Sequence, residues 1–168
     1  VFGQVGLAPG SAVTLDANVT LGAVTFSADA EGAYTVTGPN VITWDNGASL
    51  PEITMSSNQN ATLGASWHLT DDLLVTANTA KLTLSPDAIT ADDSLGYVLE
   101  IGSGGQKVTW ASSGADLSGI SDIFVDGYLM ADAASAFGPD VAANSPGISV
   151  STGGILGAKN SSALNADV

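Results

Sequence analysis

The sequence has 168 residues, of which 45% are hydrophobic and only 12% are charged. Seventeen acidic residues stand against three lysines, arginine and cysteine are absent, and the formal net charge at pH 7 is −14. This balance excludes nucleic acid as a partner, because no cationic surface is available to replace the counterions of the phosphates. The lack of cysteine excludes disulfides and thiolate metal sites. No run reaches the ~20 consecutive apolar residues that a bilayer span needs, so no membrane insertion is expected.

Short runs that alternate apolar and polar residues, broken by Gly, Asn, Asp, Ser or Pro, dominate the sequence. Val13-Thr14-Leu15, Val24-Thr25-Phe26 and Leu82-Thr83-Leu84 show the period of two that half-buried strands have. The expected strands, in chain order, are 12–15, 19–21, 23–26, 34–37, 41–44, 52–55, 61–63, 67–69, 73–76, 81–84, 97–101, 107–110, 123–125, 128–130, 147–150 and 155–156.

Strands of this length and spacing are typical of a sandwich, a barrel or a β-solenoid. Two corner-like steps, Asp16-Ala17-Asn18 and Asp126-Gly127, reorient the chain without the longer loop of a hairpin and favour the solenoid. We therefore expect an all-β fold, a parallel β-helix with coils of roughly 20–28 residues, and keep the β-sandwich as the alternative. No composition break divides residues 1–168, which we expect to form one solenoid domain. Because the chain starts at Val1, we expect a processed chain or a segment of a larger surface assembly.

Residues 117–158 contain the most specific pattern in the chain. Four short motifs follow one another there: Ser118-Gly119, Asp126-Gly127-Tyr128-Leu129, Ala136-Phe137-Gly138 and Gly153-Gly154-Ile155-Leu156. Their order resembles the autotransporter-associated β-strand repeat of bacterial surface proteins. The resemblance implies a right-handed parallel β-helix that is exported and displayed outside the cell, as in passenger-type stalks, adhesins and surface fibres.

An uncapped β-helix also exposes an unpaired hydrogen-bonding ladder at each end, and such ends can dock head to tail. We therefore expect a structural subunit of an extracellular bacterial fibre or surface layer, with other copies of itself as its partner. One alternative is an adhesin or carbohydrate-binding passenger fragment whose partner is a surface polysaccharide. Another is a β-sandwich, pilus-like subunit completed by a donated strand.

Three tryptophans, Trp44, Trp67 and Trp110, are the candidate interaction residues. On one outer face, together with Tyr34, Tyr97 and Tyr128, they would form a platform on which sugars stack. Large aromatic side chains equally fill the interior of a solenoid or a protein interface. The sequence leaves these alternatives open.

Two pairs of neighbouring acids, Asp71-Asp72 and Asp92-Asp93, are the candidate metal ligands. Loop carboxylates can coordinate Ca²⁺ together with backbone carbonyls. Neither pair stands in the spaced acidic loop of an EF-hand or in the glycine-rich nonapeptide of calcium-binding solenoids. Because Asp also favours corners for its turn chemistry, the sequence predicts no cofactor and leaves Ca²⁺ as the alternative.

His68 is the single histidine, and it lacks a second histidine or a cysteine to complete a metal site. Most acids stand in turns, and the absence of arginine leaves only three lysines to neutralise an anionic substrate, as a polysaccharide lyase would require. We therefore expect that the chain is not an enzyme.

Overall fold

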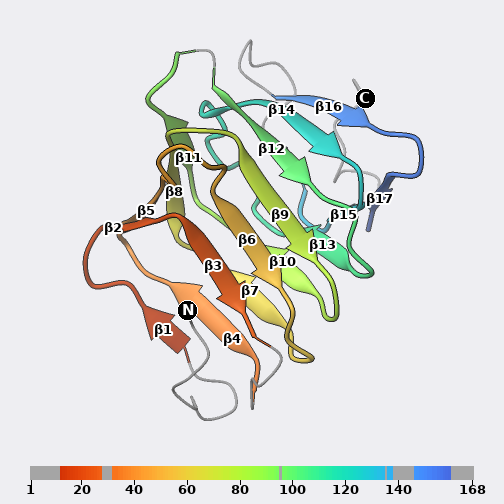
Figure 1. The fold of residues 1–168 in the computed structure, drawn as a ribbon, viewed down its shortest axis with the longest axis horizontal. Helices are drawn as coiled ribbons and strands as arrows, with labels where there is room; N and C mark the ends of the chain where they lie inside the picture. The colour runs from red at the N-terminus through yellow and green to blue at the C-terminus, as the bar shows by residue number, and fades with distance from the viewer. Residues whose placement is uncertain (1–11, 28–31, 95, 135, 138–145, 160–168) are drawn as a thin grey trace.

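The computed structural model describes residues 12–27, 32–94, 96–134, 136–137 and 146–159 (Figure 1). Strands account for all regular structure there, and no helix in these ranges is long and apolar enough to cross a membrane. The strands are β1 (Ala12–Thr14), β2 (Val19–Leu21), β3 (Ala23–Phe26), β4 (Tyr34–Thr37), β5 (Val41–Trp44), β6 (Glu52–Met55), β7 (Ala61–Leu63), β8 (Ser66–Leu69), β9 (Leu73–Ala77), β10 (Leu82–Leu84), β11 (Ile89–Ala91), β12 (Tyr97–Ile101), β13 (Lys107–Trp110), β14 (Ile120–Val125), β15 (Tyr128–Ala131), β16 (Gly147–Val150) and β17 (Ile155–Ala158).

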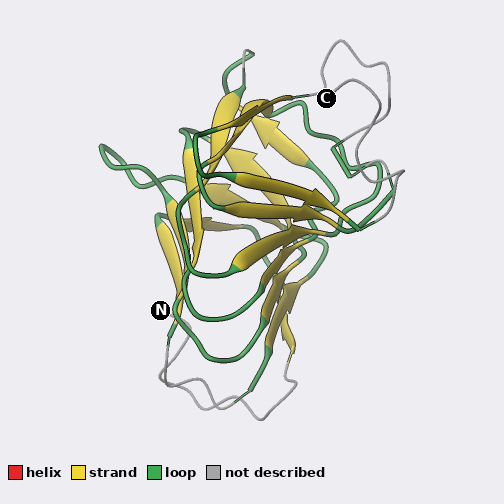
Figure 2. Cartoon of the chain, turned by 90° about the vertical axis from the view of Figure 1, so that its right-hand side faces the viewer, coloured by secondary structure: helices red, strands yellow, loops and turns green. Residues whose placement is uncertain are grey.

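The strands form three sheets whose neighbours are separated by a whole coil of the chain. The seven-stranded sheet has the order β1-β4-β7-β10-β13-β15-β17, the six-stranded sheet β16-β14-β12-β9-β6-β3, and the four-stranded sheet β11-β8-β5-β2. Every strand pairing among the described residues is parallel. The fold is therefore a parallel β-solenoid of about five turns, and Figure 2 shows the strand stacks joined by loops that run round the coil.

These pairings confirm the expected solenoid and contradict the sandwich alternative, because a sandwich of antiparallel strands would pair neighbours in opposite directions. The pilus-like subunit with a donated strand depended on that sandwich and loses its structural basis.

Alternation in the sequence decides which side chains fill the coil. In β9, Leu73, Val75 and Ala77 are buried, whereas Leu74 and Thr76 are half-buried on the outside. Equivalent positions stack from coil to coil, so that outward threonines form a ladder on the seven-stranded sheet. This ladder contains Thr35, Thr62, Thr83 and Thr109, of which Thr109 is buried. Stacking of like residues keeps each face flat and gives one continuous apolar interior.

One strand was not expected from the sequence. β11 pairs in parallel with β8, and its Ile89 is fully buried against Trp67. The four-stranded sheet ends at β11, and the next coil contributes only an isolated bridge between Ala88 and Asp116 on this side. The expected bounds of the other strands are correct to within one or two residues, except that β14 begins at Ile120, three residues before the expected 123.

Two glycines show how closely the coils approach at the corners. A Cβ atom on Gly127 would collide with the backbone carbonyl of Gly102 in the preceding coil, and one on Gly154 would collide with the carbonyl of Val125. Since the colliding atoms belong to the backbone, no rotamer change could relieve either contact. These corners therefore require residues without a side chain.

Candidate functional site

The three tryptophans lie in the core, in a column that runs along the solenoid. Trp44, Trp67 and Trp110 are at most 1% exposed, and Phe137 extends the column beyond Trp110. Ring centroids are 5.9 Å apart between Trp44 and Trp67 and 6.5 Å apart between Trp67 and Trp110. This burial contradicts the outer-face alternative for these residues and agrees with the interior one. The tryptophans cannot offer a surface on which sugars stack.

The indole N–H groups of this column find no conventional acceptor. The Nε1 atoms of Trp44, Trp67 and Trp110 are buried without a hydrogen-bond partner. The ring planes are nearly perpendicular, at 82° and 80°, so that an indole edge meets a neighbouring ring face. Such edge-to-face contacts suit the quadrupoles of the rings and allow weak N–H···π bonds. The column is therefore a structural element of the core.

The tyrosines are divided between the core and the surface. Tyr34 is buried beside Phe26, with ring centroids 5.9 Å apart. Tyr97 is half-buried and packs against the core from the six-stranded sheet, whereas Tyr128 lies on the outer side of the seven-stranded sheet. The six aromatic residues therefore do not form a common platform.

Candidate metal ligands gather at the corner between the four-stranded and six-stranded sheets. Register places Thr70 beside Asp92, because Leu69 pairs with Ala91 immediately before them. The Tyr97 hydroxyl donates a hydrogen bond of 2.7 Å to the Asp92 carboxylate, and Asp71 and Asp93 lie close enough to act on Tyr97 electrostatically. The structure therefore brings Asp71, Asp92 and Asp93 to one corner.

The hydrogen bond to Asp92 raises the pKa of Tyr97 from 10.0 to about 12, with smaller contributions from desolvation and from the negative charges of Asp92, Asp93 and Asp71. The pKa rises because ionisation of Tyr97 removes the proton that it donates to Asp92. Ionisation would also place a negatively charged phenolate beside a carboxylate.

The carboxylates of this corner accept hydrogen bonds from backbone N–H groups and from a hydroxyl group. Asp72 accepts a hydrogen bond of 2.7 Å from the backbone N–H of Val98 in the next coil, and Asp71 accepts one of 2.8 Å from the N–H of Asp72. Within the described ranges, no three acidic or histidine side chains are arranged to hold a metal ion. The carboxylates that form hydrogen bonds here act as corner residues, which is the turn chemistry expected of Asp.

His68 lies on the four-stranded sheet, in the outward ladder that contains Thr43 and Thr90. Its Nδ1 shares a hydrogen bond of 3.1 Å with the Thr90 hydroxyl. The Thr90 hydroxyl is also 3.4 Å from the Trp67 carbonyl, to which it donates. His68 therefore links neighbouring coils through Thr90.

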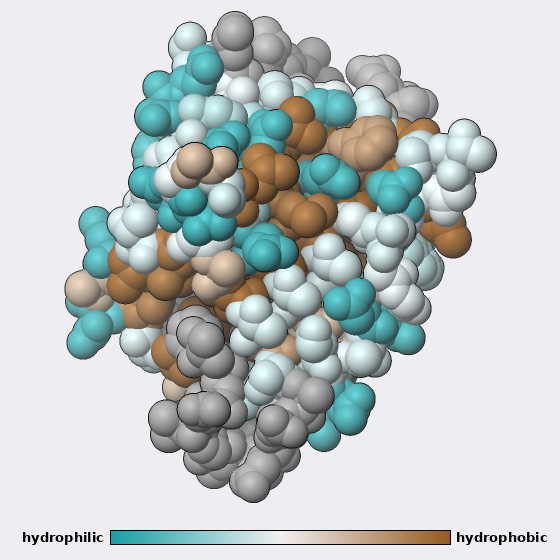
Figure 3. All heavy atoms as spheres, in the orientation of Figure 1, coloured by the Kyte–Doolittle hydropathy of each residue, from teal (hydrophilic) through white to brown (hydrophobic). Residues whose placement is uncertain are grey.

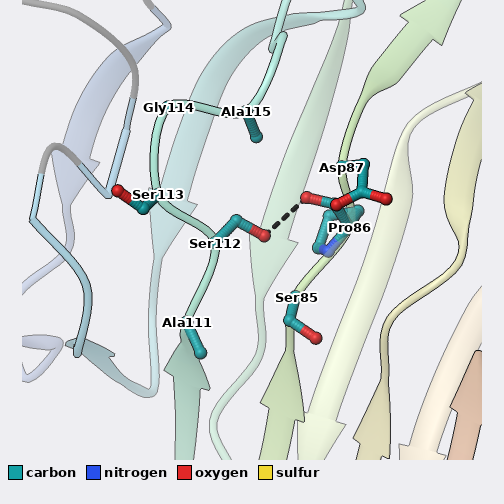
Figure 4. Close-up of a pocket in the computed structure, with 8 residues that line it drawn as sticks. All are labelled: Ser85, Pro86, Asp87, Ala111, Ser112, Ser113, Gly114 and Ala115. Atoms are coloured by element: carbon teal, nitrogen blue, oxygen red, sulfur yellow. Dashed lines mark hydrogen bonds between the residues drawn. The ribbon is translucent and has the colours of Figure 1, made fainter.

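A shallow hollow of about 420 Å³ lies where the chain leaves β10 and β13 (Figure 4). The Ser112 hydroxyl donates a hydrogen bond to the Pro86 carbonyl, whereas the Ser113 hydroxyl turns away and donates to the Ala134 carbonyl. The hollow is lined by Ser85, Pro86, Asp87, Ala111, Ser112, Ser113, Gly114 and Ala115. It contains one carboxylate and no aromatic ring, so it provides neither a pair of acids for glycoside hydrolysis nor a face for sugar stacking.

The two end coils leave part of the apolar interior uncovered. Val150 pairs with the fully buried Val125 and points inward like it, yet Val150 is 45% exposed because no further described strand covers it. At the opposite end, Leu21 occupies the position of the buried Trp44 and is only half-buried. Ile155, on the outward side of β17, is 54% exposed. Sequence reasoning predicted unpaired ladders at the ends but not these residues, which the alternation in β2 and β16 could have identified.

The motifs of residues 117–158 fall mainly on the corners and strands of the last coils. Ser118-Gly119 precedes β14, Asp126-Gly127 forms the corner between β14 and β15, and Gly153-Gly154 leads into β17. Gly138 lies outside the described residues, although Phe137 before it is buried against Trp110. No family model matches the chain, and neither a curated protein nor a solved structure matches it significantly.

Proposed function

We propose that this chain is a structural subunit of an extracellular bacterial fibre or surface layer, and that it acts by end-to-end self-association. The observation that carries this proposal is the open end of the stack. β16 and β17 at one end, and β1, β2 and β3 at the other, each have a strand neighbour on one side only among the described residues. Both kinds of edge lack a second strand partner among the described residues and lie next to partly exposed apolar side chains.

A second copy could continue the stack. Parallel pairing repeats through the solenoid with the same inward and outward pattern, so β17 could receive β1 of a second copy. Because the six-stranded sheet has one strand fewer than the seven-stranded sheet, β16 and β3 of the second copy would then lie two strand spacings apart, with room for one further strand between them. The second copy would lie over the end that exposes Val150, and the first copy over the end at which Leu21 is only half-buried. Because the two surfaces differ, the contact is heterologous and can propagate into a filament.

The resemblance of residues 117–158 to the autotransporter-associated β-strand repeat supports the extracellular location and the right-handed coil that this proposal includes. The net charge of −14 is consistent with a protein that stays soluble at high concentration. A carbohydrate-binding passenger fragment remains the second candidate, but the burial of the three tryptophans removes its main support.

Sedimentation velocity over a wide concentration range, together with electron microscopy, tests the proposal. We expect the wild-type chain to form linear particles that lengthen with concentration. Val150→Asp should keep the protein monomeric, because a carboxylate would be buried in the new contact. Thr152→Asp adds the same charge in a neighbouring exposed turn and should assemble like wild type. A wild-type chain that stays monomeric, or a Val150→Asp variant that assembles normally, would overturn the proposal; circular dichroism establishes that both variants are folded.

A further inference from the structure

Charged side chains on the strands are divided between two faces of the solenoid. Within the described residues, the six-stranded sheet contains the acids Glu52, Glu100 and Asp122, and no strand of the other two sheets contains an acid. The seven-stranded sheet contains Lys107, and Lys81 stands immediately before its strand β10. Asp132 stands immediately after its strand β15 and is paired with Lys159. A strongly acidic protein therefore presents one face whose strands contribute only positive charge.

The two lysines lie side by side on that face. Leu82 pairs with Val108, which places the preceding residues, Lys81 and Lys107, in neighbouring coils. The ion pair found in the described part of the chain joins Lys159 to Asp132, with 2.6 Å between Nζ and Oδ1, and includes neither of the two. Lys81 and Lys107 thus keep their charges available to a partner.

Apolar side chains accompany the lysines. Lys107 pairs with Tyr128 in the next coil, and Met130 follows two residues later on the same outer side of β15. Both side chains are half-buried. The outer face of the seven-stranded sheet therefore combines a cationic pair with an adjoining apolar area.

The six-stranded sheet carries the opposite combination. Glu100 pairs with Leu74 on one side and with Phe124 on the other, and all three alternate with buried residues and point outward. Figure 3 shows this side of the molecule, where hydrophobic and hydrophilic side chains lie next to one another over β9, β12 and β14. A carboxylate flanked by two apolar side chains matches a lysine flanked by Tyr128.

We propose that a second copy of this chain binds laterally, with the outer face of its six-stranded sheet against the outer face of the seven-stranded sheet of the first. Glu100 of one copy then faces Lys107 of the other, and Leu74 and Phe124 contact Tyr128. Two copies of net charge −14 repel each other in most orientations, and this orientation is favoured because it places opposite charges across the contact. The contact itself does not depend on end-to-end association, and only its role in bundling fibres rests on the proposed function.

The size of the face predicts a weak contact that gains strength by repetition. Seven strands about 4.8 Å apart and about 13 Å long span roughly 400 Å² per copy, or about 800 Å² in total. This area is below the ~1,200 Å² that stable complexes usually bury. Lateral pairs should therefore be transient between single subunits and persistent between stacks, where many contacts act together.

Zero-length cross-linking tests the contact directly, because the chain has only three lysines. Isotope-labelled and unlabelled Val150→Asp protein, which cannot stack if the proposed function holds, is mixed at about 0.15 M salt and treated with a carbodiimide. Mass spectrometry should find mixed-isotope amides that join Lys81 or Lys107 to Glu52, Glu100 or Asp122. No mixed-isotope links, or links distributed equally over acids in turns such as Asp16 and Asp87, would overturn the proposal.

A charge swap supplies the matched control. Lys107→Glu removes one reactive amine, so the links through Lys81 are compared, and their mixed-isotope yield should fall about tenfold because an attraction becomes a repulsion. Adding Glu100→Lys to Lys107→Glu restores the net charge and should restore the yield. Lys159→Glu makes the same change at a lysine that already pairs with Asp132, and should leave links to Lys107 unchanged. If the Lys107→Glu/Glu100→Lys protein gives as few mixed-isotope links as Lys107→Glu, the lateral contact is contradicted. Linear stacks of the wild-type protein would still support the proposed function in that case.

Discussion

The indole rings of Trp44 and Trp67 meet edge to face inside the coil, with centroids 5.9 Å apart and planes 82° apart. Trp67 makes the same kind of contact with Trp110 on its other side, and Trp110 in turn contacts Phe137, so Trp67 is the middle one of the three tryptophans. Trp67 and Trp110 therefore each have aromatic neighbours in both directions along the column. The core of this solenoid is therefore organised along its axis as well as within each coil.

Replacing the middle tryptophan should be among the most destabilising single changes. Trp67→Ala removes a fully buried ring and leaves a cavity between Trp44 and Trp110, which is expected to lower the free energy of unfolding by about 3–5 kcal/mol. Denaturant unfolding followed by far-ultraviolet circular dichroism measures this. Thr20→Ala, on the exposed side of β2, is the control and should change stability by less than about 0.5 kcal/mol. A loss below 1 kcal/mol for Trp67→Ala would show that the column does not hold the coils together.

The corner glycines lead to a second prediction. Gly127→Ala should destabilise the fold by roughly 2–3 kcal/mol, because its Cβ collides with the Gly102 carbonyl and only backbone movement can relieve the contact. Gly114→Ala is a useful comparison, since Gly114 has a φ of +66° but open space around it. Gly114→Ala should lower the free energy of unfolding by only the ~1–2 kcal/mol that an alanine costs in a left-handed backbone conformation. Thermal unfolding of both variants measures the two losses of stability. Equal losses would argue against close approach of the coils at Gly127.

Asp72 provides a link between coils that a single substitution can break. Asp72→Ala removes the acceptor for the backbone N–H of Val98, and the loss of this charged acceptor is expected to destabilise the protein by about 1.5–3 kcal/mol. Asp87→Ala, at an exposed carboxylate that lines the hollow, is the control of equal charge change. Urea unfolding of the two variants should differ by at least 1 kcal/mol; similar midpoints would mean that the Asp72 hydrogen bond contributes little.

The Tyr97–Asp92 hydrogen bond predicts a dependence on alkaline pH. Because the pKa of Tyr97 is raised in the folded protein to about 12, its contribution to stability is present below pH 10 and is lost as the pH rises towards 12. Nuclear magnetic resonance of the labelled tyrosine ring should give a midpoint near 12 for Tyr97. In Asp92→Asn the midpoint should move back towards 10, and an unchanged midpoint would exclude Asp92 as the main cause.

Local alternation was sufficient to predict nearly all of the strands, and the corner-like steps favoured the solenoid over the sandwich. It could equally have placed Trp44 inside, because the residue two positions earlier, Ile42, is apolar and the intervening Thr43 is polar. β11 was missed since Ile89-Thr90-Ala91 has one large apolar residue and is followed directly by Asp92-Asp93, which resembles a turn.

Contacts between coils could not be predicted from the sequence. Thr62 pairs with Thr83, and Thr83 pairs with Thr109, so successive coils differ in length. Without a fixed period, the register that places Lys81 beside Lys107 or Asp92 beside Thr70 is not readable from spacing. Pairing of the backbone in three dimensions decides these neighbours.

Fibre diffraction from oriented wild-type assemblies, combined with cryo-electron microscopy, tests end-to-end stacking most directly. Coil-on-coil continuation predicts a reflection near 4.8 Å along the long axis of the particles, since the strand spacing of each subunit would continue across the subunit boundary. Particles whose strand spacing lies across the long axis, or preparations that contain only single subunits at all concentrations, would contradict the account.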